Sequence, residues 1–183
     1  IVRLGDWNWS ENVGTRRDQA GTFMHELGHN LGRRHGGTQW YNYKPNYLSV
    51  MNYAFQVNGL IKNASQGNFD YSRFQLSNLD ENNLDETAAL TTTSATTDTY
   101  GTYWFCGPKQ ITQTATLANP IDWDCKPALS TPTTVTANIN AGLNDAPDTE
   151  YALLEGSSDW DRLVYMGGAL GLPGASVELP IVT

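Results

Sequence analysis

Residues 25–35 read His25-Glu26-Leu27-Gly28-His29-Asn30-Leu31-Gly32-Arg33-Arg34-His35, and they contain all three histidines of this 183-residue chain. His25 and His29 are four residues apart, so on a helix both imidazoles project from the same face. Gly32 can adopt a left-handed conformation, which would turn the chain out of the helix and bring His35 back as a third ligand. Three nitrogen ligands leave one tetrahedral position open, and an open position is typical of a catalytic zinc site.

Glu26 lies beside the predicted zinc ligands on the same helical turn. Bound zinc lowers the pKa of a water ligand from about 15.7 to about 7 and polarises a carbonyl oxygen. A carboxylate next to that water can take its proton and later deliver it to a leaving amine. We therefore predict that Glu26 is the general base and acid of a hydrolase.

The eleven-residue pattern resembles the extended zinc motif of the metzincin metalloproteases. The clan also has a tight turn that carries a methionine beneath the zinc, and Ser49-Val50-Met51-Asn52-Tyr53 is similar to it, with Met51 sixteen residues after His35. The resemblance implies that Met51 underlies the site. It also implies that Tyr53, as in astacins, serralysins and pappalysins, is a movable zinc ligand that helps to hold the transition state. Gly36 departs from the Glu of astacins, the Pro of serralysins and the Asp of adamalysins, so no subfamily is assigned.

The zinc motif falls on a predicted helix from about Gln19 to Leu31, with Asp18 as the N-cap and Gly32 at the C-terminal end. The helix has one apolar stripe, formed by Ala20, Phe23, Leu27 and Leu31.

The rest of the chain favours short elements, and the fold class we predict is α+β. A second helix is expected after an N-cap at Ser77, with an imperfect apolar stripe of Leu79, Leu84, Ala88 and Leu90. Residues 60–74 are expected to be a loop. Strands are expected at residues 1–4, 100–105, 111–117 and 133–139, and residues 159–166 fit either a strand or a short helix.

The charge divides the chain into two parts. Eight basic and nine acidic side chains give residues 1–90 a net charge of −1, and three basic and ten acidic ones give residues 91–183 a net charge of −7. The resemblance to metzincins does not extend past Leu90, and it implies a zinc-protease core in residues 1–90, with the active-site helix, the methionine turn and the second helix. Residues 91–183 are expected to form an acidic, β-rich portion packed on that core.

Cys106 and Cys125, 19 residues apart, are the only cysteines. A single pair in a polar, Thr- and Asn-rich chain favours a disulfide and an oxidising compartment, and the alternative is two buried thiols. We therefore expect the protein to be secreted or otherwise extracytoplasmic.

The resemblance also implies how much of a metzincin catalytic domain this chain contains. Metzincins place a sheet of about five strands before the active-site helix, whereas only 24 residues precede His25 here. A strand commonly needs about five or six residues, so one or two strands fit. We expect the chain to lack most of that sheet, which a complementary N-terminal chain or segment would supply. The helix face of Ala20, Phe23 and Leu27 would then lack its usual cover.

Composition excludes several classes of partner. A net charge of −8 argues against binding to nucleic acid or to anionic lipid, which need clustered Lys and Arg. No apolar segment approaches the roughly 20 residues of a transmembrane helix. Acidic residues cluster in three places and suggest either structural Ca²⁺ or a solvated acidic surface: Asp122/Asp124, Asp145/Asp148/Glu150 and Asp159/Asp161.

Together these features predict a zinc-dependent endopeptidase that acts on protein or peptide substrates. One alternative is a catalytically inactive zinc-binding module that keeps a protease scaffold to bind protein or glycan, although inactive relatives usually lose the residue at the position of Glu26. A second alternative is a zinc hydrolase that acts on a non-peptide amide.

Overall fold

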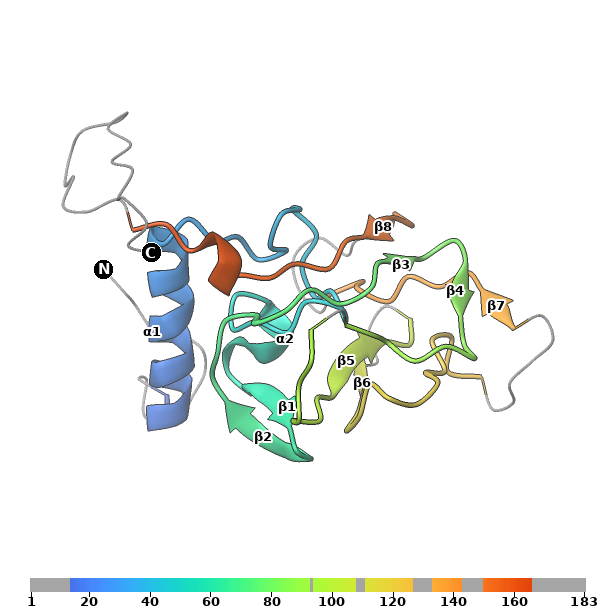
Figure 1. The fold of residues 1–183 in the computed structure, drawn as a ribbon, viewed down its shortest axis with the longest axis horizontal. Helices are drawn as coiled ribbons and strands as arrows, with labels where there is room; N and C mark the ends of the chain where they lie inside the picture. The colour runs from blue at the N-terminus through green and yellow to red at the C-terminus, as the bar shows by residue number, and fades with distance from the viewer. Residues whose placement is uncertain (1–13, 93, 108–110, 127–132, 143–149, 166–183) are drawn as a thin grey trace.

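The structure is a computed structural model, and it describes residues 14–165 except 93, 108–110, 127–132 and 143–149. Figure 1 shows helix α1 at one end of the molecule and strands β4 and β7 at the other. The elements, in chain order, are α1 (Arg16–Asn30), α2 (Tyr53–Gln56), β1 (Leu60–Lys62), β2 (Ser65–Asn68), β3 (Leu79–Asp80), β4 (Leu84–Asp85), β5 (Thr102–Phe105), β6 (Ile111–Thr114), β7 (Thr134–Val135), β8 (Leu153–Leu154) and the 3₁₀ helix η1 (Trp160–Arg162).

The strands form antiparallel pairs: β1 with β2, β3 with β8, β4 with β7, and β5 with β6. The predicted α+β class is therefore confirmed, and none of the sheets among the described residues exceeds two strands. The pairs β3–β8 and β4–β7 join segments that lie far apart in the sequence. The strand predicted at residues 1–4 lies outside the described residues.

Strands β5, β6 and β7 lie within the predicted ranges but are shorter. Residues 159–166 contain the short helix η1 rather than a strand. The loop predicted at residues 60–74 is wrong in part, because β1 and β2 form a hairpin there. The predicted disulfide between Cys106 and Cys125 is present, with 5.7 Å between the two Cα atoms.

Helix α1 begins three residues earlier than the sequence predicted. Thr15 is the N-cap and accepts a hydrogen bond from the backbone amide of Asp18, whose side chain accepts one in return from the Thr15 amide. Asp18 is therefore the third residue of a capping box rather than the N-cap. At the other end Gly32 has a positive φ of 79°, and the amide of Arg33 donates to the carbonyl of Gly28, which ends the helix where the sequence placed its end.

Most of the predicted apolar stripe of α1 faces solvent, and only Leu31 at its end is half-buried. Phe23 is 59% exposed and Leu27 40% exposed, and Ala20 is exposed as well. The buried residues of the helix are Gly21, Thr22, His25 and Gly28. The helix therefore packs through small residues and one histidine. This packing places His25, the first histidine of the zinc motif, on the buried face of the helix.

Gly21 lies where α1 meets α2, and the fit leaves no room for a larger residue. A Cβ atom at this position would overlap the carbonyl oxygen of Gln56 and approach the ring of Phe69 to 2.7 Å. Gly21→Ala should therefore lower the free energy of unfolding by about 1–3 kcal/mol, although alanine is the better helix former. Thermal or urea unfolding measures this, with Phe23→Ala on the exposed face as a control that changes stability little. Unchanged stability of Gly21→Ala would mean that the two helices do not pack this closely.

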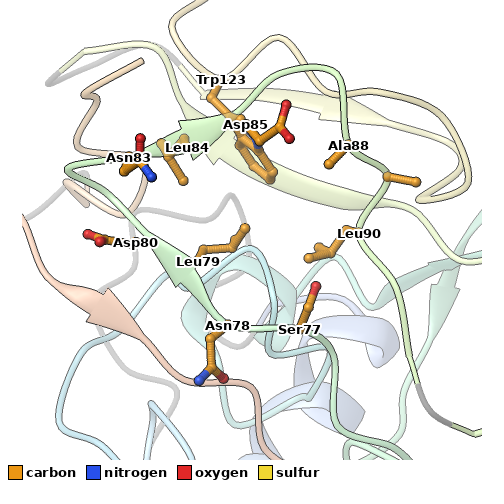
Figure 2. Close-up of a pocket in the computed structure, with 11 residues that line it drawn as sticks. Ser77, Asn78, Leu79, Asp80, Asn83, Leu84, Asp85, Ala88, Leu90 and Trp123 are labelled. Atoms are coloured by element: carbon orange, nitrogen blue, oxygen red, sulfur yellow. The ribbon is translucent and has the colours of Figure 1, made fainter. Parts of the chain in front are cut away.

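The second helix predicted from Ser77 is wrong. The side chains of Asp80 and Asp85 accept hydrogen bonds from the backbone amides two residues further on, at Asn82 and Thr87. Such local bonds compete with helical ones. The backbone is instead taken up by the pairs β3–β8 and β4–β7. The apolar side chains of this segment line a small pocket, and Figure 2 shows Leu84, Leu90 and Trp123 around it.

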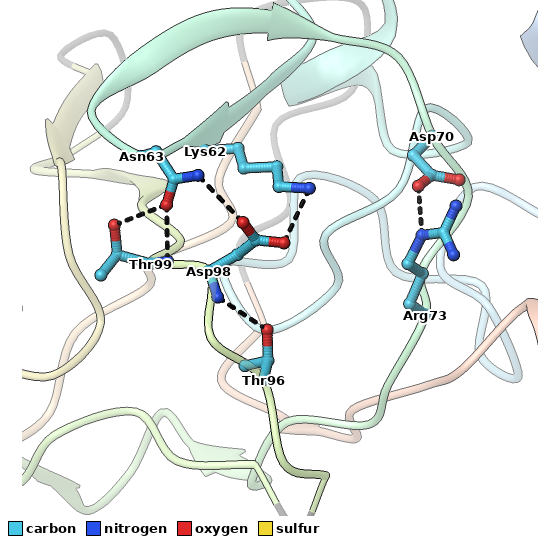
Figure 3. Close-up of polar contacts among 7 residues, drawn as sticks. All are labelled: Lys62, Asn63, Asp70, Arg73, Thr96, Asp98 and Thr99. Carbon is cyan, nitrogen blue, oxygen red and sulfur yellow. Dashed lines mark hydrogen bonds and ion pairs between the residues drawn. The ribbon is translucent and has the colours of Figure 1, made fainter.

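The main hydrophobic core draws on both parts of the chain that the charge had distinguished. Its buried members include Phe55, Leu84, Trp123, Ile139 and Leu154. Polar contacts on the surface add little to it: the ion pairs Lys62–Asp98 and Asp70–Arg73 are exposed or partly exposed (Figure 3), and such pairs typically contribute about 0–1 kcal/mol.

A smaller buried cluster of Tyr47, Val50, Met51 and Tyr71 has Met24 of α1 packed against it. Among the described residues, no helix is both long and apolar enough to cross a membrane.

Candidate metal centre

The structure brings the three histidines together. The Nε2 atom of His29 lies 3.2 Å from Nε2 of His25 and 3.1 Å from Nε2 of His35. His25 and His29 are one turn apart on α1, and the glycine turn after the helix returns His35 to them. His25 is buried, His35 is half-buried and His29 is exposed. The histidine cluster therefore lies at the protein surface, with the His25 side of it covered by protein.

Backbone carbonyls fix the tautomers of the two helical histidines. Nδ1 of His25 lies 2.9 Å from the carbonyl oxygen of Val50, and Nδ1 of His29 lies 2.9 Å from that of Arg33. A carbonyl oxygen only accepts, so each Nδ1 carries the proton, and in the neutral ring each Nε2 presents a bare lone pair. Two lone pairs that face each other at 3.2 Å repel unless a cation lies between them.

The surroundings also favour the neutral rings that a metal needs. Burial lowers the pKa of His25, although the hydrogen bond from its ring to Val50 opposes the shift. Burial and the neighbouring His25 and His29 lower the pKa of His35 to about 4.

The donor set fits zinc. Two nitrogens that each lie about 2.0–2.1 Å from one tetrahedral ion are roughly 3.3 Å apart, close to the 3.1 and 3.2 Å found here. Imidazole nitrogens suit zinc, whereas magnesium and calcium prefer oxygen ligands. The hydrogen bonds to Val50 and Arg33 orient the rings, as carbonyl acceptors commonly do for zinc-ligating histidines.

The turn predicted around Met51 lies against the helix. The amide of Asn52 donates to the carbonyl of Ser49 over 3.0 Å, which closes a tight turn. Met51 is fully buried, and a Cβ atom on Gly28 would overlap its sulfur, so the methionine packs directly on the helix between the two ligand histidines. Val50 supplies the carbonyl that orients His25, so the turn and the histidine cluster form one unit.

Tyr53 follows this turn as the first residue of α2. Its ring centroid lies 4.3 Å from that of His35 and 5.4 Å from that of His25, and the residue is 41% exposed. Burial, and after it the charge of Glu26, raises the pKa of Tyr53. Glu26 also acts electrostatically on His25. Glu26 therefore lies within electrostatic reach of both Tyr53 and His25, and the catalytic roles of Glu26 and Tyr53 stay predictions.

Sequence reasoning missed the residues that hold Tyr53 in place. Oδ1 of Asn42 accepts hydrogen bonds from the backbone amides of Tyr43 and Tyr53. The ring of Tyr43 packs edge-on against Tyr53, 5.9 Å between centroids, and also edge-on against Phe105, 5.5 Å between centroids. Residues 42 and 43 lie in a long loop without periodicity, so no local signal marks them.

The acidic residues give a mixed result for calcium. Glu86, Asp122 and Asp124 offer carboxylate oxygens within 4.8 Å of one another. However, the backbone amide of Asp124 donates to Glu86, and Lys126 forms an ion pair with Asp124 at 2.6 Å. These contacts already satisfy part of the negative charge, and calcium binding stays a prediction. Asp145 and Asp148 lie outside the described residues.

Comparisons with protein-family models, with curated proteins and with solved structures find no match to this chain.

Proposed function

We propose that this protein is a metzincin-type zinc-dependent endopeptidase that works in an extracytoplasmic compartment. The observation that carries the proposal is the convergence of three imidazole nitrogens beside Glu26, with two of the rings fixed so that bare Nε2 atoms face the same point. The disulfide between Cys106 and Cys125 favours an oxidising compartment.

In this proposal His25, His29 and His35 hold the zinc, and Met51 supports them from beneath. Zinc, when bound, supplies a Lewis acid that polarises the scissile carbonyl and acidifies a water. Glu26 takes the proton of the attacking water and then delivers it to the leaving amine. The Tyr53 hydroxyl donates a hydrogen bond to the carbonyl oxygen as negative charge develops there.

The tests of this function are metal content and proteolysis by the full chain. We expect one zinc per chain, cleavage of a denatured protein mixture, loss of cleavage with a chelator, and recovery when zinc is restored. A chain that binds one zinc and cleaves neither proteins nor small amides is a binding module instead. Cleavage of small amides alone would assign a non-peptide amidase, and absence of zinc binding would refute the metal centre itself.

A further inference from the structure

We propose that Asp159 is a positioning residue of the metal centre, which fixes the turn at residues 49–52 and, through that turn, the imidazole of His25. This inference rests on the proposed zinc site. Asp159 lies just before η1, more than 120 residues after the histidine cluster, and its place in the sequence gives no indication of such a role.

The Asp159 carboxylate is fully buried and accepts three hydrogen bonds. Oδ1 accepts from the hydroxyl of Tyr47 over 2.7 Å. Oδ2 accepts from the hydroxyl of Ser49 over 2.6 Å and from the backbone amide of Ser72 over 3.1 Å. The Asp159 amide in turn donates to the Ser72 carbonyl over 2.8 Å, so the position of the carboxylate is held by its own backbone.

The hydroxyl of Ser49 relays this contact to the turn. Its oxygen accepts the backbone amide of Met51 over 3.1 Å, which leaves its own proton to be donated to Asp159. The next carbonyl in the chain, that of Val50, accepts from Nδ1 of His25 over 2.9 Å. Asp159 is therefore joined to His25 through Ser49 and the backbone of residues 49–51.

Tyr47, Ser49 and Ser72 all donate to the Asp159 carboxylate, which is the arrangement that an ionised acceptor requires. Burial raises the pKa of Asp159, and these three hydrogen bonds oppose that shift. Burial, and after it the neighbouring carboxylate of Asp159, raises the pKa of Tyr47, so that the phenol keeps its proton and donates. Hydrogen bonds to an ionised acceptor are roughly twice as strong as neutral ones. A charged anchor thus holds the turn more firmly than a neutral residue of the same shape could.

Glu81 provides a matched comparison within the same molecule. It is also fully buried, and its carboxylate accepts from the backbone amides of Ile139 over 2.7 Å and Ala152 over 2.9 Å. Neither partner belongs to α1, to the turn or to the histidine cluster. Neutralising Glu81 therefore tests the loss of a buried carboxylate without the connection to His25.

The experiment compares Asp159→Asn with Glu81→Gln in the full chain, by titrating zinc into the metal-free protein against a competing chelator and by measuring Tm of the metal-free form. We expect both variants to lower Tm. Only Asp159→Asn should weaken zinc binding, by about ten- to a hundredfold, the usual effect of losing a group that orients a ligand. Glu81→Gln should bind zinc within about threefold of wild type.

Several outcomes overturn the inference. Wild-type zinc affinity in Asp159→Asn would leave Asp159 with a structural role only, and an equal loss of affinity in both variants would point to general loosening of the fold. If Asp159→Asn does not fold, Ser49→Ala removes only the relaying hydroxyl, and wild-type zinc affinity in that variant overturns the proposal equally. A wild-type chain that binds no zinc refutes the proposed function instead, which keeps the two failures distinct.

Discussion

Replacing Glu26 with glutamine should lower kcat for protein cleavage by several orders of magnitude, while zinc content and Tm stay close to those of wild type. Glutamine keeps the size and hydrogen-bonding capacity of the side chain but cannot accept the proton of the attacking water. General acid–base catalysis typically contributes about 10²–10⁴-fold, and here the same group serves in both directions of proton transfer. Glu26 lies on α1 next to His25 but does not belong to the ligand set, so the metal should remain.

Steady-state kinetics with a quenched peptide substrate, together with metal analysis of the same preparation, measure the effect of Glu26→Gln. Glu155→Gln makes the same chemical change at an exposed position and should keep wild-type kcat. A Glu26→Gln variant that still cleaves protein at a tenth of the normal rate would show that Glu26 is not the general base.

The candidate site was predictable because its determinants are local. Helical periodicity places His25 and His29 on one face, and Gly32, with a positive φ of 79°, returns His35 to them. The resemblance to the metzincin methionine turn likewise predicted the bend around Met51, which the bond from Asn52 to Ser49 closes. Each of these interactions spans only a few residues, which is the range over which sequence patterns carry information.

The fold around the site was less predictable because distant segments decide it. The leucines after Ser77 have roughly helical spacing, yet β3 pairs with β8 and β4 pairs with β7, from segments about 75 and 50 residues further along the chain. Asp18 is a residue type that commonly caps helices, but in the structure Thr15 is the N-cap and Asp18 is its partner in the capping box. Local preference is a weak guide where tertiary contacts compete with it.

The packing of α1 illustrates the same limit. The sequence identified an apolar stripe that includes Phe23 and Leu27, and both side chains are exposed. It did not predict which face is buried, because Gly21 and Gly28 contribute no hydrophobic signal. Because these glycines have no side chain, Gln56 and Met51 can pack directly against the helix. The need for glycine at these positions depends on the partner segments, which the local sequence does not reveal.

Replacing Tyr53 with phenylalanine should lower kcat at least tenfold, with KM and zinc content close to those of wild type. The ring of Tyr53 lies 4.3 Å from that of His35, centroid to centroid, and its raised pKa keeps the phenol protonated and able to donate. A donor that meets the carbonyl oxygen only as charge develops stabilises the transition state rather than the bound substrate, so the loss appears in kcat. Removal of one such donor typically costs about 10²–10³ in kcat, or roughly 2.7–4 kcal/mol.

Tyr71→Phe is the matched control, because it removes a hydroxyl that serves packing. The Tyr71 hydroxyl donates to the carbonyl of Met24 over 2.6 Å on the buried side of α1. Its loss should cost about 1 kcal/mol of stability, the usual net value of a hydrogen bond, and leave kcat nearly unchanged. If Tyr53→Phe instead behaves like Tyr71→Phe, with a lower Tm and wild-type kcat, the phenol of Tyr53 only packs beside His35. The oxygen of the scissile carbonyl must then be stabilised without it.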